Sequence, residues 1–103
     1  MAVRDQIRAA RQAHEVLRSS PPVRANLAEK AELYRTVKAV LDDVWADADR
    51  PGAAPAAEVR RAVRLLTVDA EYYAGLNDSE GFRDPAEAWE QYELLERACG
   101  GVG

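Results

Sequence analysis

The sequence predicts an all-α protein, a single-domain four-helix bundle with up-down-up-down topology. Apolar residues recur at helical spacing in four segments, and stretches containing proline or glycine separate these segments. No segment alternates between apolar and polar residues for long enough to form a strand. With 103 residues the chain has the length of one domain. We therefore expect residues 1–103 to form one helical domain, with residues 99–103 as a flexible tail.

The first helix is expected over residues 2–18. Its apolar stripe follows the helical period and consists of Val3, Ile7, Ala10, His14 and Leu17. Ser19-Ser20-Pro21-Pro22 ends this helix, because the residue before a proline avoids the helical region and proline has no N–H to donate.

The second helix is expected over residues 23–48, with Asn26 and Glu29 as a capping box near its start. Its apolar residues are Leu27, Leu33, Tyr34, Val37, Val40, Leu41, Val44 and Trp45. They form a face wide enough to contact neighbours on two sides, so we expect this helix to be central and to favour self-association. Pro51-Gly52 breaks the chain after the helix.

The third and fourth helices are expected over residues 55–76 and 85–98. The apolar stripe of the third helix consists of Val59, Ala62, Val63, Leu66, Ala70, Tyr73 and Leu76. Gly75 or Asn77 is expected to end it. Asp84 is expected to cap the start of the fourth helix, with Pro85 in the first turn. The inner face of the fourth helix is expected to contain Trp89, Tyr92 and Leu95.

The net charge is −4, but the charges are unevenly distributed along the chain. Residues 1–41 contain eight basic and four acidic side chains, whereas residues 42–103 contain six basic and fourteen acidic ones. We expect the two halves to neutralise each other, helix against helix, and the alternative is that the asymmetry attracts a charged partner.

The sequence shows no feature of a membrane or secreted protein. There is no run of 18 apolar residues and no signal-peptide pattern at the start. The single cysteine, Cys99, has no partner for an intrachain disulfide. We expect a cytoplasmic protein with no membrane contact.

No metal or cofactor site is expected. The chain has one histidine and one cysteine, too few for a zinc site in a single chain. The acidic loop at residues 77–84 does not fit a calcium-binding EF-hand, because placing Gly81 at position six puts Leu76 at position one, where a ligand is needed.

His14 is expected to be structural. A helical bundle of about 100 residues with one histidine on a helix resembles histidine phosphotransfer domains. In those domains the residue one turn after the histidine is small, whereas here it is Arg18. Because His14 also continues the apolar stripe of the first helix, we expect a half-buried structural histidine.

Carboxylates of the second helix raise an enzymatic alternative. The spacing of Glu29-x-x-Glu32 is similar to the carboxylate arrays of helical phosphohydrolases, in which paired carboxylates bind Mg²⁺ or transfer protons. The third helix offers Glu58 and Asp69 but no second array of this kind. We therefore expect a non-catalytic protein and keep a carboxylate-based phosphohydrolase as an alternative.

Residues 69–92 combine acidic and aromatic side chains. Seven residues of this stretch are acidic, one is basic, and five of the seven aromatic residues of the chain lie in it. Aromatic contacts surrounded by carboxylates suit a basic protein partner. We expect a small protein-interaction or accessory module that forms a homodimer or binds such a partner. The expected partner-binding residues are Glu71, Tyr72, Asp78, Glu80, Phe82, Glu87 and Glu90.

Nucleic-acid binding is the second alternative. Arg4, Arg8 and Arg11 share one face of the first helix, and basic helices can bind phosphates. The acidic net charge of the chain disfavours this function.

Overall fold

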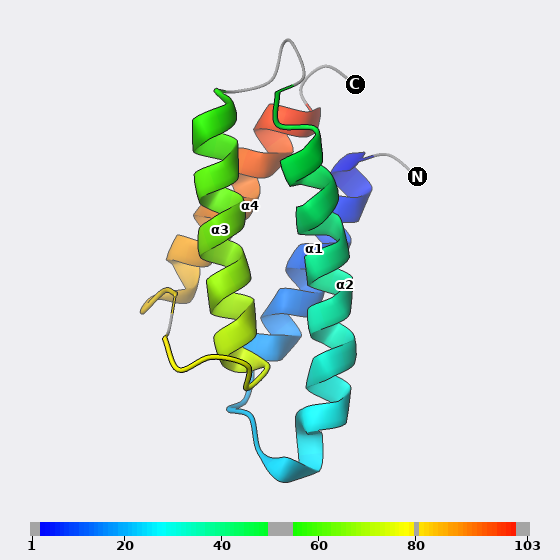
Figure 1. Ribbon diagram of the computed structural model, residues 1–103, viewed down its shortest axis with the longest axis vertical. Coiled ribbons are helices and arrows are strands. Elements are labelled where there is room, and N and C mark those ends of the chain that lie inside the picture. Colours follow the sequence, from blue (N-terminus) through cyan, green and yellow to red (C-terminus); the bar gives the residue numbers. More distant parts are fainter. Residues whose placement is uncertain (1–2, 50–54, 80, 101–103) are drawn as a thin grey trace.

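The computed structural model describes residues 3–49, 55–79 and 81–100. These residues form four α-helices: α1 (Val3–Arg18), α2 (Leu27–Ala46), α3 (Ala56–Tyr73) and α4 (Pro85–Gly100). Figure 1 shows them side by side and alternating in direction, with the start of α1 and the end of α4 at the same end of the molecule. The predicted up-down-up-down four-helix bundle is confirmed. None of the helices in the part of the chain described is long and apolar enough to cross a membrane.

The hydrophobic core runs along the axis of the bundle, and every helix contributes to it. Its almost fully buried residues include Ile7 and Leu17 from α1, Val37 and Leu41 from α2, Val59 and Leu66 from α3, and Tyr92 and Leu95 from α4. These residues belong to the apolar stripes seen in the sequence, because residues three, four and seven apart lie on one helix face. Four positions of the predicted apolar stripes are exposed instead: Val3 and Trp45 are each 37% exposed, Leu27 is 44% exposed and Leu76 is 61% exposed.

The end of α3 explains why Leu76 leaves the core. Gly75 adopts a φ of +80°, a conformation that costs glycine little. The Leu76 N–H donates to the Glu71 carbonyl (2.8 Å) and the Gly75 N–H donates to the Tyr72 carbonyl (3.1 Å). This pair of bonds is the Schellman arrangement, which stops a helix and turns the chain away from its axis. Gly75 is thus one of the two predicted stops, and the helix ends three residues earlier than expected.

The connection between α1 and α2 differs from the prediction. Asn26 does not form a capping box with Glu29. Its side chain instead accepts the Val23 N–H (2.8 Å) and donates to the Pro21 carbonyl (3.2 Å), which stabilises a short 3-10 helix at Arg24–Asn26. The regular helix therefore begins at Leu27 rather than at residue 23.

A buried lysine fixes the same connection from the other side. Lys30 is 3% exposed, and its Nζ donates to the carbonyls of Leu17 (2.6 Å) and Ser20 (2.7 Å). These carbonyls lie at the end of α1, where a helix leaves its last carbonyls without partners and favours a positive charge. Burial lowers the pKa of Lys30, although the neighbouring Glu29 opposes this shift.

The start of α4 agrees with the prediction. The Ala86 N–H donates to Oδ1 of Asp84 (2.9 Å), so this carboxylate caps the helix. At the other end α4 extends to Gly100. The first two residues of the predicted tail, residues 99 and 100, therefore belong to the helix. Residues 101–103 of that tail lie outside the described residues.

Candidate functional site

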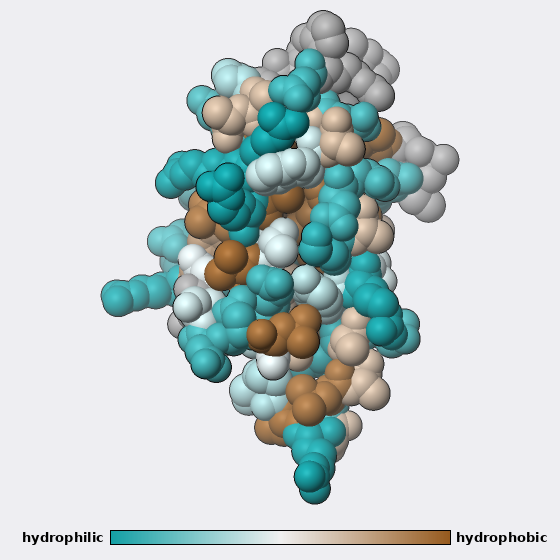
Figure 2. Space-filling model, in the orientation of Figure 1, coloured by the Kyte–Doolittle hydropathy of each residue, from teal (hydrophilic) through white to brown (hydrophobic). Residues whose placement is uncertain are grey.

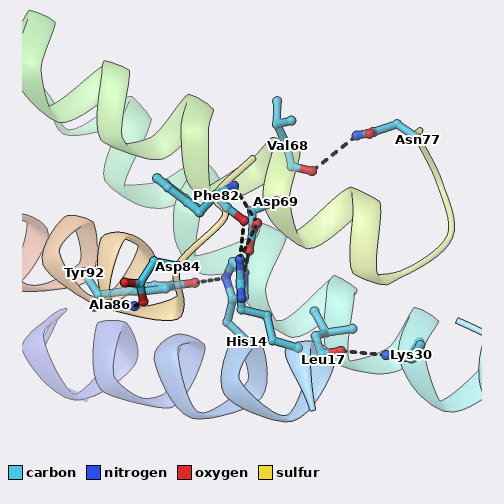
Figure 3. A network of polar contacts seen from close by, with 11 residues as sticks. His14, Leu17, Lys30, Val68, Asp69, Asn77, Phe82, Asp84, Ala86 and Tyr92 are labelled. Atoms are coloured by element: carbon cyan, nitrogen blue, oxygen red, sulfur yellow. Dashed lines mark hydrogen bonds and ion pairs between the residues drawn. The ribbon is translucent and has the colours of Figure 1, made fainter. Parts of the chain in front are cut away.

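A buried polar network lies where α1, α3 and α4 meet (Figure 3). His14 from α1, Asp69 from α3 and Tyr92 from α4 are all fully buried. His14 lies between the other two: its Nε2 is 2.7 Å from Oδ2 of Asp69, and its Nδ1 is 2.7 Å from the Tyr92 hydroxyl. The imidazole ring therefore joins three helices through two hydrogen bonds.

Arg18 and the chain around Phe82 complete this network. The Arg18 guanidinium donates from Nε to Oδ2 of Asp69 (2.8 Å) and from Nη2 to Oδ1 (3.1 Å). The same Nη2 donates to the Phe82 carbonyl (2.8 Å), while the Phe82 N–H donates to Oδ1 of Asp69 (3.1 Å). The loop before α4 is therefore fixed to α1 and α3 through one ion pair.

The protonation states follow from these contacts. Burial alone would raise the pKa of Asp69, but the hydrogen bonds and charges of His14 and Arg18 outweigh it and hold that pKa below its usual value. Burial, together with the nearby Asp69 charge, raises the pKa of Tyr92, so its hydroxyl keeps its proton. Because a carboxylate only accepts, Nε2 of His14 donates to Asp69. The Tyr92 hydroxyl both donates and accepts, so it can bond to Nδ1 in either direction.

Aromatic rings and arginine stems surround the imidazole. His14 makes edge-to-face contacts with Trp89 (6.0 Å between ring centroids) and with Tyr92 (5.5 Å). The Arg11 guanidinium lies 5.5 Å from the Trp89 ring, and that of Arg18 lies 4.7 Å from the Tyr73 ring. An Asp-His-Tyr chain can relay protons, but catalysis requires contact with a substrate, and here all three side chains are sealed. The network of His14, Arg18, Asp69 and Tyr92, called the clasp below, holds α1, α3 and α4 together inside the bundle.

Sequence reasoning found part of this network. The expectation of a structural histidine agrees with the contacts of His14, although the residue is fully rather than half buried. Arg18, considered only as an obstacle to phosphotransfer, is the ion-pair partner of Asp69. The burial of Asp69 in the network was not predicted, although its position in the sequence indicates it. Asp69 lies seven residues after Ala62 and three after Leu66, and therefore on the apolar stripe of α3.

The carboxylates considered for an enzyme do not converge. On α2, Glu29 and Glu32 are exposed, as is Glu58 on α3, whereas Asp69 is buried in the network. Within residues 3–49, 55–79 and 81–100 there is no group of three or more His, Cys, Asp or Glu side chains that could hold a metal ion.

The expected acidic and aromatic partner-binding residues are dispersed. Glu71 is half-buried and accepts from the Tyr34 hydroxyl (3.4 Å) and the Asn77 amide (3.3 Å), which turns it towards α2. Tyr72 is half-buried against Tyr73, with ring centroids 5.0 Å apart. Three further acids are exposed: Asp78 in the loop after α3, and Glu87 and Glu90 on α4. Glu80 lies outside the described residues.

Phe82 requires a correction. We expected its ring on an exposed docking surface, but it is 7% exposed and belongs to the core. The cause is the backbone of this residue, whose N–H and carbonyl bond to Asp69 and Arg18 and draw the loop inward.

The arginines of α1 contact acidic and aromatic side chains. Nε of Arg8 lies 2.7 Å from Glu96 on α4, and Nε of Arg11 lies 3.3 Å from Glu15. Arg4 is exposed and lines a cavity of about 250 Å³ together with Arg8, Glu93, Glu96 and Arg97. The Arg8–Glu96 pair joins the two halves of the chain, helix against helix, whereas Arg11 and Glu15 both belong to the first half.

An open groove lies between α2 and α3, on the face turned towards the viewer in Figure 2. It encloses about 410 Å³, and its lining includes Lys38, Asp42, Trp45, Arg64, Thr67 and Glu71. Trp45 remains 37% exposed, with the guanidinium groups of Arg60 and Arg64 at 5.4 and 5.9 Å from its ring.

The molecule thus has two candidate sites of opposite character. The network around His14 is sealed and fully bonded, whereas the groove between α2 and α3 is open and lined by both charged and apolar side chains. No family model, no curated protein and no solved structure matches the chain.

Proposed function

We propose that this chain is a small non-catalytic protein-interaction module that docks partners on one face of the bundle. This surface, called the α2–α3 face below, consists of the groove between the two helices and of exposed Val23, Leu27 and Leu76. These three residues lie in the chain beside the start of α2 and the end of α3, which are at the lower end of the bundle in Figure 1. The side chains with catalytic potential are sealed inside the bundle, so a surface rather than an active site carries the function.

The distribution of exposed hydrophobic residues carries this proposal. Six large hydrophobic residues are exposed in the described part of the chain: Val3, Val16, Val23, Leu27, Trp45 and Leu76. Trp45 lines the groove, Leu27 begins α2, and Leu76 follows Gly75 in the turn that packs on Leu27. Clustered exposed apolar side chains surrounded by polar ones are typical of protein-binding sites, whereas single ones need no explanation.

The lower end of the face gathers residues from two connections. A methyl group built on Gly75 would lie 3.2 Å from Cδ2 of Leu27 and 3.3 Å from Cβ of Pro22. The turn after α3 therefore packs on the start of α2, and exposed Leu76 and Val23 are the chain neighbours of Gly75 and Pro22. In Figure 2 hydrophobic patches accordingly appear in the lower half of this view.

The proposal changes the docking residues suggested by the sequence. It keeps Glu71, which lines the groove, and exposed Asp78, which follows Leu76 by two residues in the chain. The buried Phe82 is replaced by Trp45, a tryptophan between arginines, which is a residue type enriched where binding energy concentrates.

Site-specific photo-crosslinking tests the proposal. A photoreactive amino acid at Thr67, inside the groove, should give a defined adduct with an identified protein, whereas one at exposed Glu93 on α4 should not. Binding of that purified protein should weaken in Trp45→Ala and Leu76→Ser. The matched control is Val16→Ser, which changes an exposed valine outside the face. Equal adducts at both positions, or none at Thr67, would overturn the proposal.

A further inference from the structure

The charged side chains of the groove alternate in sign along both helices. On α2 the positive Lys38 precedes the negative Asp42, to which its Nζ donates, and on α3 the positive Arg64 precedes the negative Glu71. Because the two helices are antiparallel, Arg64 lies at the Trp45 end, 5.9 Å from that ring, and Glu71 lies at the other end, bonded to Tyr34. Each end of the groove therefore has one positive and one negative side chain, on different helices.

This alternating pattern is complementary to itself. In a face-to-face pair related by a two-fold axis parallel to the helices, Asp42 would face Arg64 of the second copy, and Lys38 would face its Glu71. With the axis across the helices, Lys38 would face Asp42, and Arg64 would face Glu71. Opposite charges meet in both arrangements, which is what an interface between identical surfaces requires.

We infer that the partner docked on the α2–α3 face is a second copy of this chain, an inference that rests on the proposed function. A basic or acidic partner would match two of the four groove charges and repel the other two, whereas a second copy matches all four. The four charges also sum to zero, although the whole chain carries −4, so the groove adds no net repulsion between the copies. Trp45, Leu27 and Leu76 supply apolar area on the same face.

The test pairs two variants with opposite charge patterns. In the acidic variant, Lys38→Glu with Arg64→Glu, all four groove charges are negative; in the basic variant, Asp42→Lys with Glu71→Lys, all four are positive. Each variant alone should dimerise more weakly than the wild type by more than roughly tenfold in Kd, measured by sedimentation velocity over a concentration series. An equimolar mixture should restore a dimer that contains one copy of each, identified by a mass tag on one variant.

Two control variants carry the same charge changes away from the groove. Glu87→Lys with Glu90→Lys and Arg24→Glu with Arg97→Glu alter exposed residues and should leave the Kd unchanged. Circular dichroism checks folding, and Asp42→Lys alone replaces the basic variant if loss of the Glu71 contacts unfolds it.

Three results would overturn the inference: a monomeric wild type, groove variants that dimerise with the same Kd as the wild type, or a mixture of the two variants that does not associate. A monomer that still forms a Trp45-dependent adduct at Thr67 with another protein would leave the proposed function standing. No adduct at Thr67 at all would reject the proposed function as well.

Discussion

Nε2 of His14 lies 2.7 Å from the Asp69 carboxylate in the sealed centre of the bundle, although 55 residues separate them in the chain. Both side chains are fully buried, and Arg18 supplies the opposite charge. A buried ion pair contributes little net stability while it is intact, because desolvation offsets its attraction, but removing one partner leaves an uncompensated charge. The stability of this bundle should therefore be sensitive to change at this point.

Replacing Asp69 with Asn should lower the free energy of unfolding by about 3 to 5 kcal/mol. The substitution removes the negative charge that accepts from His14, from Arg18 and from the Phe82 N–H in the buried centre of the bundle. Urea unfolding followed by circular dichroism measures the loss. The control is Asp43→Asn at an exposed position outside the groove, which should change stability by no more than about 0.5 kcal/mol. An equally small loss at Asp69 would show that the network is not the clasp described above.

Nε2 of His14 should carry a proton in the folded protein. It lies 2.7 Å from the Asp69 carboxylate, which only accepts, so the bond between them requires this proton. The chain has one histidine, so a long-range ¹H–¹⁵N correlation spectrum reports this ring without ambiguity. Nitrogen shifts of a ring without a proton on Nε2 would contradict the bond to Asp69.

Tyr92→Phe provides the companion test of the hydrogen bond at Nδ1. It removes the partner of Nδ1 and leaves a buried ring nitrogen unsatisfied, which costs about 1 to 3 kcal/mol of unfolding free energy. Tyr72→Phe is the matched control, because Tyr72 is half-buried, and it should cost less. A Tyr92→Phe protein as stable as the control would mean that the hydroxyl contributes no hydrogen bond.

Asp69 should also make the bundle sensitive to acid. Its pKa is lower in the folded than in the unfolded chain, so the stability that it contributes is complete at neutral pH. Below about pH 4 the unfolded carboxyl takes up a proton while the folded one remains ionised, and this stability is lost as the pH falls towards the folded pKa. The measurement is the difference in unfolding free energy between wild type and Asp69→Asn at several pH values. The difference should shrink as the pH falls, and a difference that stays constant from neutral pH into acid would refute the assignment.

The helices could be predicted from the sequence because their signals are local. Apolar residues three, four and seven apart define a helix face without knowledge of the neighbours, and the Asp84 cap and the Gly75 stop involve residues a few positions away. The error at the start of α2 has a related origin. The Asn26 side chain was predicted to pair with Glu29 but bonds to the Pro21 carbonyl, and this bond depends on the path of the chain before the helix.

The clasp and the groove could not be predicted in this way. The His14–Tyr92 contact spans 78 residues and depends on the rotation of α1 and α4 about their axes, which the apolar stripes fix only approximately. Phe82 shows the same limit, because an aromatic residue in a polar loop gives no sign that its backbone will bond to a buried carboxylate. The charge pattern of the groove depends on the register of α2 against α3, because the register determines which charged side chains lie together at each end.

Gly81 should be required for the loop to reach Asp69. A methyl group built on Gly81 would lie 2.8 Å from Cβ, 2.9 Å from the backbone nitrogen and 3.0 Å from Cα of Asp69. Backbone atoms inside a helix cannot move aside as a flexible side chain can, so Gly81→Ala must push the loop away from α3 and lengthen the bonds of Phe82. We expect a loss of about 1 to 3 kcal/mol in unfolding free energy, measured by urea unfolding. Ser79→Ala, at an exposed position of the same loop, is the control and should leave stability nearly unchanged. In a double variant with Asp69→Asn the two losses should be less than additive, because both act on the same contact, whereas full additivity would place the effect of Gly81 outside the clasp.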